Sequence, residues 1–118
     1  SEMCIRDRLL RRMGAVVDDL VIEQVIRKGT ADIGENYLDV MKAAARDYTA
    51  EIFRKLREHE YNPELMRLYV VGGGGCMIEN FGDYVRNRVT ISHDICAAAK
   101  GYEMLAVRKI QKNGGRLI

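Results

Sequence analysis

Hydrophobic side chains recur at alternating steps of three and four residues through the middle of the chain. This stripe consists of Leu38, Met41, Ala45, Tyr48, Ile52 and Leu56. Such spacing predicts one long amphipathic helix that packs its apolar face on a core. Asp32 and Glu35 have the D-x-x-E spacing of a helix-capping signal, and Asn62-Pro63 predicts the end of the helix. A coiled coil is the alternative, but the stripe is shorter than the roughly 3–4 heptads typical of one.

A shorter helix is predicted before the long one. Asp18 and Asp19 suit its first turn, where carboxylates complement the helix dipole, and Gly29 is expected to end it. The residues expected to lie on one face of this helix are Leu20, Val21, Gln24, Val25 and Lys28. This segment is also short and apolar enough to form a strand.

The period changes after the proline. Leu68–Val71 is a short, β-favouring apolar run that leads directly into Gly72–Gly75. An uninterrupted apolar run of this kind is typical of a strand buried on both faces of a parallel sheet. A helix is predicted over Met77–Arg86, and a second short strand over Val89–Ser92.

A last helix is predicted toward the end of the chain, with Asp94 as its N-cap and Asn113-Gly114-Gly115 as its terminator. Its expected inward positions are Ile95, Ala98, Ala99, Tyr102, Leu105, Ala106 and Ile110. The order helix, helix, strand, helix, strand, helix predicts an α/β fold with parallel strands and right-handed crossovers. Two strands do not form a stable sheet alone, so the missing strands are expected upstream.

Composition excludes several classes of protein. The chain has 118 residues, of which 47% are hydrophobic and 31% charged, so we expect a folded domain or part of one. A net charge of +2 gives no reason to expect contact with nucleic acid or a membrane. Cys4, Cys76 and Cys96 lie far apart without a CxxC pair. A zinc site or disulfide framework is therefore not expected, and a reducing cytoplasm is the default location.

The first eight residues, SEMCIRDR, contain a stretch that resembles the translation of a sequencing adapter. We predict that residues 1–8 are an artefact of this kind, which should be left out when the fold is inferred. An ordinary charged N-terminus is the alternative. The prediction implies that the natural protein begins upstream and that this chain is a fragment.

The glycines at 72–75 are the main candidate for binding chemistry. Glycine lets the backbone adopt positive φ and approach a ligand closely, and the start of the following helix attracts anions. A tight turn without a ligand is the alternative. A P-loop is excluded because no lysine follows Gly75. A dinucleotide-binding loop fits Gly72 and Gly74, with Asp94 at about the distance of a ribose-binding acid, but Met77 stands where a small residue is expected.

The segment LYVVGGGGCMIENF (residues 68–81) resembles the adenosine-binding loop of the actin-like superfamily, in particular ParM/StbA-like plasmid-segregation ATPases. The long predicted helix is similar to the family pattern Y-x-x-x-I-x-x-x-L. ISHDICAAAKGYEML (residues 91–105) resembles a segment near the C-terminus of these proteins. The similarity covers about residues 36–110. Ala98 replaces the common asparagine of the family, and residues 11–34 match only loosely.

The resemblance implies a domain division and a site. Residues 9–34 would be a remnant of the smaller neighbouring subdomain, and residues 35–118 the C-terminal part of a ribonuclease H-like nucleotide-binding subdomain. ATP would be the ligand, with Mg²⁺ held by the missing upstream part. The cofactor-binding residues carried over by position are Gly72, Gly73, Gly74, Gly75, Cys76 and Met77. Met77 is either an apolar contact to the base or a core residue.

The resemblance also implies a function. The complete protein would bind ATP, polymerise with itself into a filament in the cytoplasm, and move plasmid or mobile-element DNA through an adaptor, without a membrane. The complete protein would be an ATPase, whereas the fragment would not hydrolyse ATP, because no catalytic set of phosphate- and metal-binding groups is found in it. The alternatives are a kinase or chaperone-type ATPase of the same superfamily, a dinucleotide-binding oxidoreductase, and a non-catalytic interaction domain.

Overall fold

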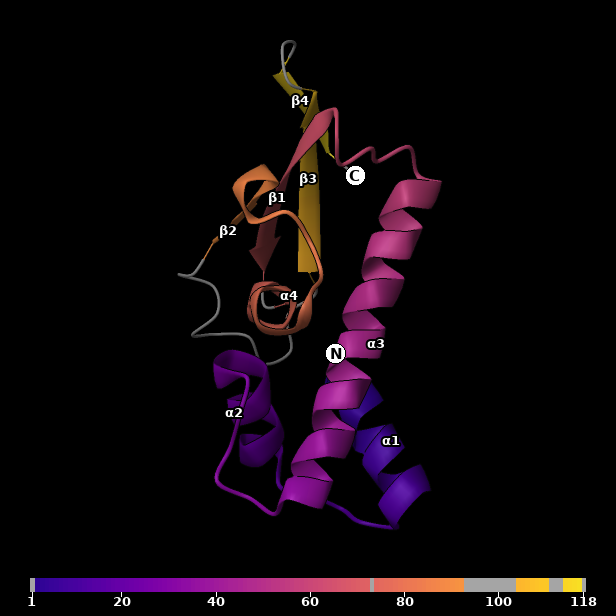
Figure 1. Ribbon diagram of the computed structural model, residues 1–118, viewed down its shortest axis with the longest axis vertical. Helices are drawn as coiled ribbons and strands as arrows, with labels where there is room; N and C mark the ends of the chain where they lie inside the picture. The colour runs from indigo at the N-terminus through magenta and orange to yellow at the C-terminus, as the bar shows by residue number, and fades with distance from the viewer. Residues whose placement is uncertain (1, 73, 93–103, 111–113, 118) are drawn as a thin grey trace.

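The computed structural model describes residues 2–72, 74–92, 104–110 and 114–117, the last two ranges as backbone. In chain order the elements are α1 (Glu2–Met13), α2 (Asp19–Lys28), α3 (Glu35–Glu58), β1 (Met66–Gly72), α4 (Gly75–Phe81), the 3₁₀ turn η1 (Arg86–Arg88), β2 (Val89–Ile91), β3 (Met104–Ile110) and β4 (Gly114–Leu117). The helices α1 and α2 lie at one end of the molecule and the sheet at the other (Figure 1). The long α3 extends from the first end to the second. The chain is therefore mixed α/β, as predicted.

The sheet has the strand order β2-β1-β3-β4. β1 pairs with β2 in parallel, with Leu68 opposite Val89, which confirms both strands and their predicted direction. On its other edge β1 pairs with β3 in antiparallel register, from Met66 opposite Ile110 to Gly72 opposite Met104. β4 then pairs antiparallel with β3. The sheet is mixed, and the prediction of parallel strands is correct only for β1 and β2.

The predicted last helix is wrong over residues 104–110, which form β3, and at Gly114-Gly115, which begin β4 rather than end a helix. The physical reason is the open edge of β1, whose backbone N–H and C=O groups find partners in β3 along seven residue pairs. The further strands of the sheet, which were expected upstream, are found downstream in the chain as β3 and β4. Asp94 and the helix positions up to Tyr102 lie outside the described residues.

Two helical ends confirm the local signals of the sequence. The Asp18 carboxylate caps α2 by accepting a hydrogen bond from the backbone N–H of Leu20 at 2.8 Å, and Gly29 ends the helix at φ +77°. The predicted face of α2 is correct at Val25, which is fully buried, but not along the whole helix. Ile22 and Ile26 are buried, whereas Leu20 is 70% exposed. The position of α1 and α4 against α2 decides which side of the helix is covered.

The long helix α3 is confirmed, but its predicted cap is not. Gly34 is the N-cap of α3 and no side chain caps it, so Asp32 does not form the capping box that its spacing with Glu35 predicted. The buried positions of α3 are Met41, Ala44, Ala45, Thr49, Phe53 and Leu56. Leu38, Tyr48 and Ile52 of the predicted stripe are only partly buried. The predicted helix after the glycines is also shorter than expected, because α4 ends at Phe81 and Val85 is exposed.

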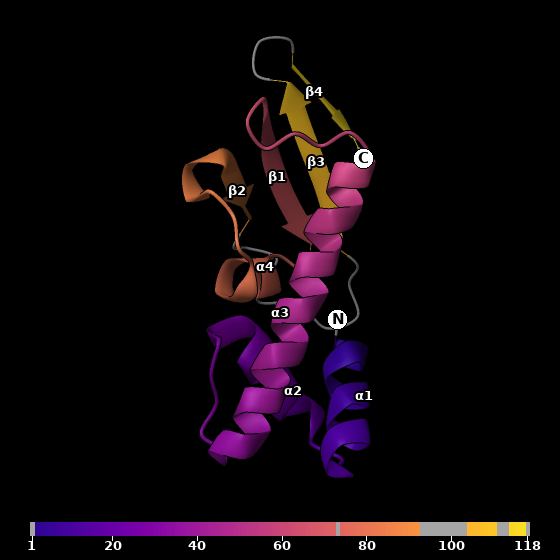
Figure 2. The same cartoon turned by 45° about the vertical axis from the view of Figure 1, so that its right-hand side comes forward.

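The described residues form two hydrophobic clusters, and α3 contributes to both. Figure 2 shows how α3 extends from the end with α1 and α2 to the end with the sheet. The lower cluster joins α1, α2, α4 and the first half of α3. The upper cluster joins the second half of α3 to β1 and β2, with Phe53 and Leu56 packed near Leu68 and Val70. α4 connects the two, since Met77 belongs to the lower cluster and Ile78 to the upper one.

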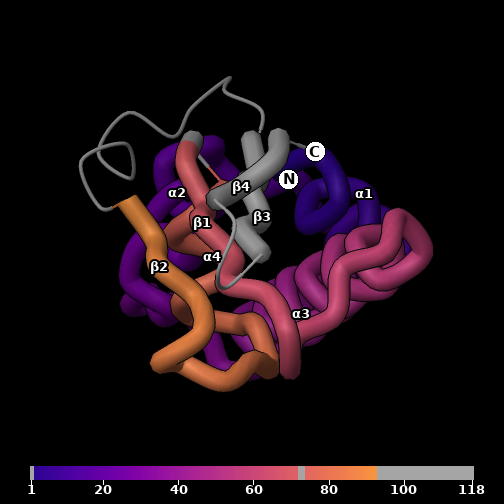
Figure 3. Tube along the Cα trace, turned by 90° about the horizontal axis from the view of Figure 1, so that it is seen from above, coloured from indigo at the N-terminus to yellow at the C-terminus, as the bar shows by residue number. Residues whose placement is uncertain are grey.

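The N-terminal segment is part of the packed structure. Residues 2–8 lie within α1, and Ile5 and Leu9 are fully buried in the lower cluster. α1 and α3 lie side by side, as the view from above also shows (Figure 3). Ile5 and Leu9 stand four residues apart on one helical face, so the described part of this segment packs with the rest of the fold. The origin of the segment from an adapter remains a prediction.

Candidate functional site

The glycine turn, residues 72–75, joins the end of a strand to the start of a helix. β1 ends at Gly72, Gly74 is the N-cap of α4, and α4 begins at Gly75. Gly73 lies outside the described residues. The parallel strand β2 lies beside β1, and in open α/β sheets ligands bind outside the carboxyl ends of parallel strands. The turn therefore has the position that a ligand-binding loop of this class requires.

The backbone of the turn does not need glycine at every position. Gly74 has φ −79° and ψ −6°, which is ordinary right-handed geometry open to any residue. The expectation that positive φ explains Gly74 is therefore wrong. Gly72 is paired opposite Met104 in the sheet, so it continues the strand.

Gly75 has a clear structural reason to be glycine. A methyl group on its Cα would lie 2.9 Å from Cγ2 of Ile91 and 3.8 Å from Cγ1 of Val70. The first distance is shorter than carbon atoms approach without strain, whose optimum lies near 3.5–4.0 Å. Gly75 thus allows the start of α4 to pack closely on β1 and β2.

The two residues after the glycines belong to the core. Met77 is 1% exposed and packs in the lower cluster, so the structure favours the core-packing interpretation of this side chain over a contact to a base. Cys76 is buried, and it is disulfide-bonded. The spacing of the cysteines did not predict this bond, because separation along the sequence does not limit how close two residues lie in space. A bonded sulfur cannot act as a thiolate nucleophile.

The remaining chemistry of the turn comes from its backbone. The first N–H groups of a helix have no partner within it and carry a partial positive charge. Within the described part of the chain, no group of three or more His, Cys, Asp or Glu side chains is placed to hold a metal ion. None of the described helices has the length and apolar character needed to cross a membrane.

Comparisons of the chain with protein-family models, with curated proteins and with solved structures found no match. The assignment of the turn therefore depends on its own geometry and on the sequence resemblance.

The structure also contains a cavity that the sequence analysis did not predict. We call it the aromatic pocket; it has a volume of about 270 Å³ and is lined by Phe53, Tyr61, Pro63, Asp83, Tyr84, Val85, Arg88 and Val89. These residues come from the end of α3, the turn after it and the segment that leads into β2. The concentration of aromatic residues near two predicted element ends was the only sequence signal, and it is a weak one.

Proposed function

We propose that the glycine turn between β1 and α4 binds the adenosine part of ATP. The chain would then be the C-terminal part of a ParM/StbA-like, actin-like ATPase that polymerises and segregates plasmid or mobile-element DNA through an adaptor. The observation that carries the proposal is the arrangement of strand, glycine turn and helix beside the parallel strand β2. The filament and its cargo rest on the sequence resemblance alone.

The physical support for binding is the lack of side chains at the turn. Gly72 and Gly74 carry no side chain at the carboxyl end of β1, and glycine allows a flat base or ribose to approach the backbone closely. Gly74 is buried at the start of α4. Gly75 keeps the start of α4 near that position by its close packing on Ile91. Cys76 and Met77 would support the site from the core rather than contact the nucleotide.

The proposal separates binding from hydrolysis. Phosphoryl transfer needs positioned cations and a metal to stabilise the developing charge. In the actin-like family these groups come largely from other segments, so Mg²⁺ would be held there. We therefore expect the 118-residue chain to release no phosphate from ATP above background. Phosphate release that EDTA abolishes would contradict this expectation.

Binding is tested by titrating a fluorescent ATP analogue into the purified chain and into the variant Gly74→Val. The branched side chain of valine would add bulk where the proposal places the nucleotide, and we expect the affinity to fall by at least about tenfold, which corresponds to about 1.4 kcal/mol. The matched control is Gly34→Val at the N-cap of α3, where an added Cβ would make only an ordinary 3.7 Å contact with Tyr37.

Circular dichroism on both variants identifies the molecules that remain folded. Equal affinity of the wild-type chain and of folded Gly74→Val, or no binding by the wild-type chain, would overturn the adenosine assignment. A turn without a ligand predicts a change in stability alone.

A further inference from the structure

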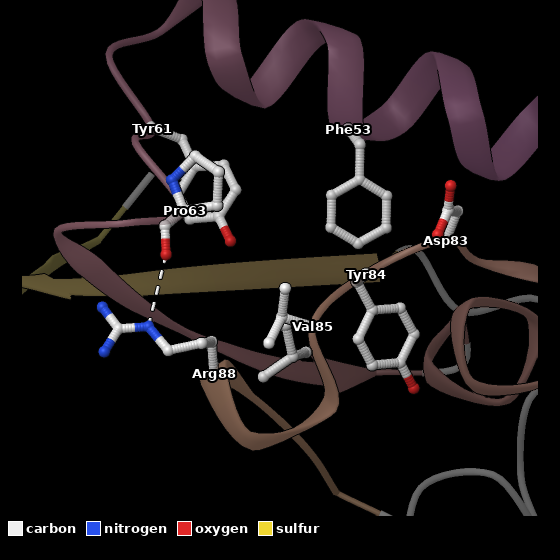
Figure 4. Close-up of a pocket in the computed structure, with 8 residues that line it drawn as sticks. Phe53, Tyr61, Pro63, Asp83, Tyr84, Val85 and Arg88 are labelled. Carbon is white, nitrogen blue, oxygen red and sulfur yellow. Dashed lines mark hydrogen bonds between the residues drawn. The ribbon is translucent and has the colours of Figure 1, made fainter.

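The aromatic pocket is lined by Tyr61, whose hydroxyl group has no hydrogen-bond partner within the described residues. Tyr61 is only 5% exposed, and its hydroxyl makes no hydrogen bond within the described part of the chain. Figure 4 shows this hydroxyl pointing toward the space between Tyr61 and Phe53. The hydroxyl oxygen can be reached from the pocket, because the only fully buried side-chain polar atom without a hydrogen bond in the described residues belongs to Arg6. The pocket therefore presents a hydrogen-bond donor to whatever occupies it.

The electrostatic surroundings of Tyr61 favour an acceptor with negative charge. Burial raises the pKa of the Tyr61 hydroxyl above its usual value, so it stays protonated and can donate at neutral pH, while the positive charges of Arg88 and Arg57 act on the same group. Arg88 is fixed in place, because its guanidinium donates hydrogen bonds to the backbone carbonyls of Pro63, Glu64 and Met66 at 3.1–3.2 Å. This end of the pocket is therefore positive.

The other walls suit a flat apolar group. The rings of Phe53 and Tyr84 are stacked, with centroids 6.0 Å apart and an angle of 24° between their planes. Val85 and Val89 line the pocket with apolar carbon. Asp83 lies beside Tyr84, away from Tyr61 (Figure 4). Its negative charge opposes an anion at that end, so the two ends of the pocket together define one orientation for a charged ligand.

We propose that the aromatic pocket binds a small aromatic carboxylate, with its ring between Tyr61 and Phe53 and its carboxylate accepting a hydrogen bond from the Tyr61 hydroxyl. Aromatic rings gain from stacking on Phe and Tyr side chains beyond the area that they bury. A volume of about 270 Å³ lies just below the range of about 300–1,000 Å³ for pockets that hold drug-sized ligands, which suits one ring better than a larger molecule.

The test is a titration of the 118-residue chain with benzoate, followed by NMR of the protein backbone. We expect saturable shifts around residues 83–89, with a dissociation constant in the millimolar range because so small a ligand has few atoms to contribute. Cyclohexanecarboxylate and benzyl alcohol are the ligand controls: the first keeps the charge without the aromatic ring, and the second keeps the ring without the charge. Both should bind more weakly than benzoate.

Two variants test the position of the ligand. Tyr61→Phe keeps the ring and removes the hydroxyl, and we expect it to weaken benzoate binding about five- to tenfold, as expected for one hydrogen bond. Tyr37→Phe, which lies outside the pocket, should bind like the wild type. Val85→Trp at the exposed rim should block binding, whereas Val16→Trp, at a residue that is 83% exposed and not part of the pocket, should not.

No saturable shift with benzoate, or equal affinity of the wild type and Tyr61→Phe, would overturn the proposal. If Tyr61→Phe fails to fold, unchanged binding by Val85→Trp would overturn it as well. ATP should not compete with benzoate, since the glycine turn contributes no residue to the aromatic pocket. The outcome is thus independent of the nucleotide proposal.

Discussion

Replacing Gly75 with alanine tests whether close packing holds the start of α4 against the sheet. The added methyl group would lie 2.9 Å from Cγ2 of Ile91 and 3.8 Å from Cγ1 of Val70. Ile91 carries its clashing methyl group on a β-branched carbon beside the backbone of β2, so it cannot move away as the end of a long side chain would. Either α4 or the Ile91 side chain must shift.

Two opposing effects set the size of the change in stability. Overpacking a filled site costs about 1–3 kcal/mol. Alanine in place of glycine within a helix stabilises by about 0.5–1 kcal/mol, because the unfolded chain loses less freedom on folding. We expect a net destabilisation of about 1 kcal/mol, which lowers the urea midpoint by roughly 0.5–1 M at the slopes typical of small proteins.

A double-mutant cycle with Ile91→Leu identifies the cause. Leucine branches one carbon farther out and removes the methyl group that the new alanine would strike. Urea unfolding of the wild type, both single variants and the double variant should show that Gly75→Ala costs at least about 0.5 kcal/mol less when position 91 is leucine. Additive effects, or a stabilising Gly75→Ala, would refute the packing role of Gly75.

Three further predictions concern the fold. Ile5→Ala should destabilise the chain by about 2–5 kcal/mol, since Ile5 is fully buried, and deletion of residues 1–8 should be at least as harmful in thermal unfolding. An unchanged melting temperature of the variant that lacks residues 1–8 would show that this part of α1 is not needed for stability. Thr49→Val should cost about 1–2 kcal/mol by removing a hydroxyl that lies 2.9 Å from the carbonyl of Arg46 and 3.2 Å from that of Phe81, to one of which it donates. Thr49→Ser keeps the hydroxyl and should retain most of the wild-type stability in the same urea assay. Burial raises the pKa of Tyr61 and of Tyr84, so the unfolded chain releases these protons first as the pH rises and stability should fall above pH 10. Replacing both tyrosines with phenylalanine should flatten that decline, and an equal decline would contradict the assigned cause.

Local signals in the sequence determined the existence and ends of several elements. Asp18 and Gly29 mark the two ends of α2, because capping needs only a short polar side chain before the helix and a left-handed glycine after it. The apolar spacing predicted α3, and the run of β-favouring residues predicted β1, because both patterns act within a few neighbouring residues. The glycine turn was also visible in this way, since its composition is unusual over four adjacent positions.

The sequence by itself did not decide the faces, the partners or the pocket. Ile22 rather than Leu20 is buried in α2, because the neighbours of a helix choose its covered side. Met104–Ile110 became a strand because the open edge of β1 offered hydrogen-bond partners that local propensity does not include. The sequence is equally compatible with Met77 as a contact to the base or as a core residue. Its core position follows from the packing of α1, α2 and α3 around it. Phe53 stacks on Tyr84 only because α3 and the segment before β2 pack together, and contacts between residues distant in sequence form only when the whole chain folds.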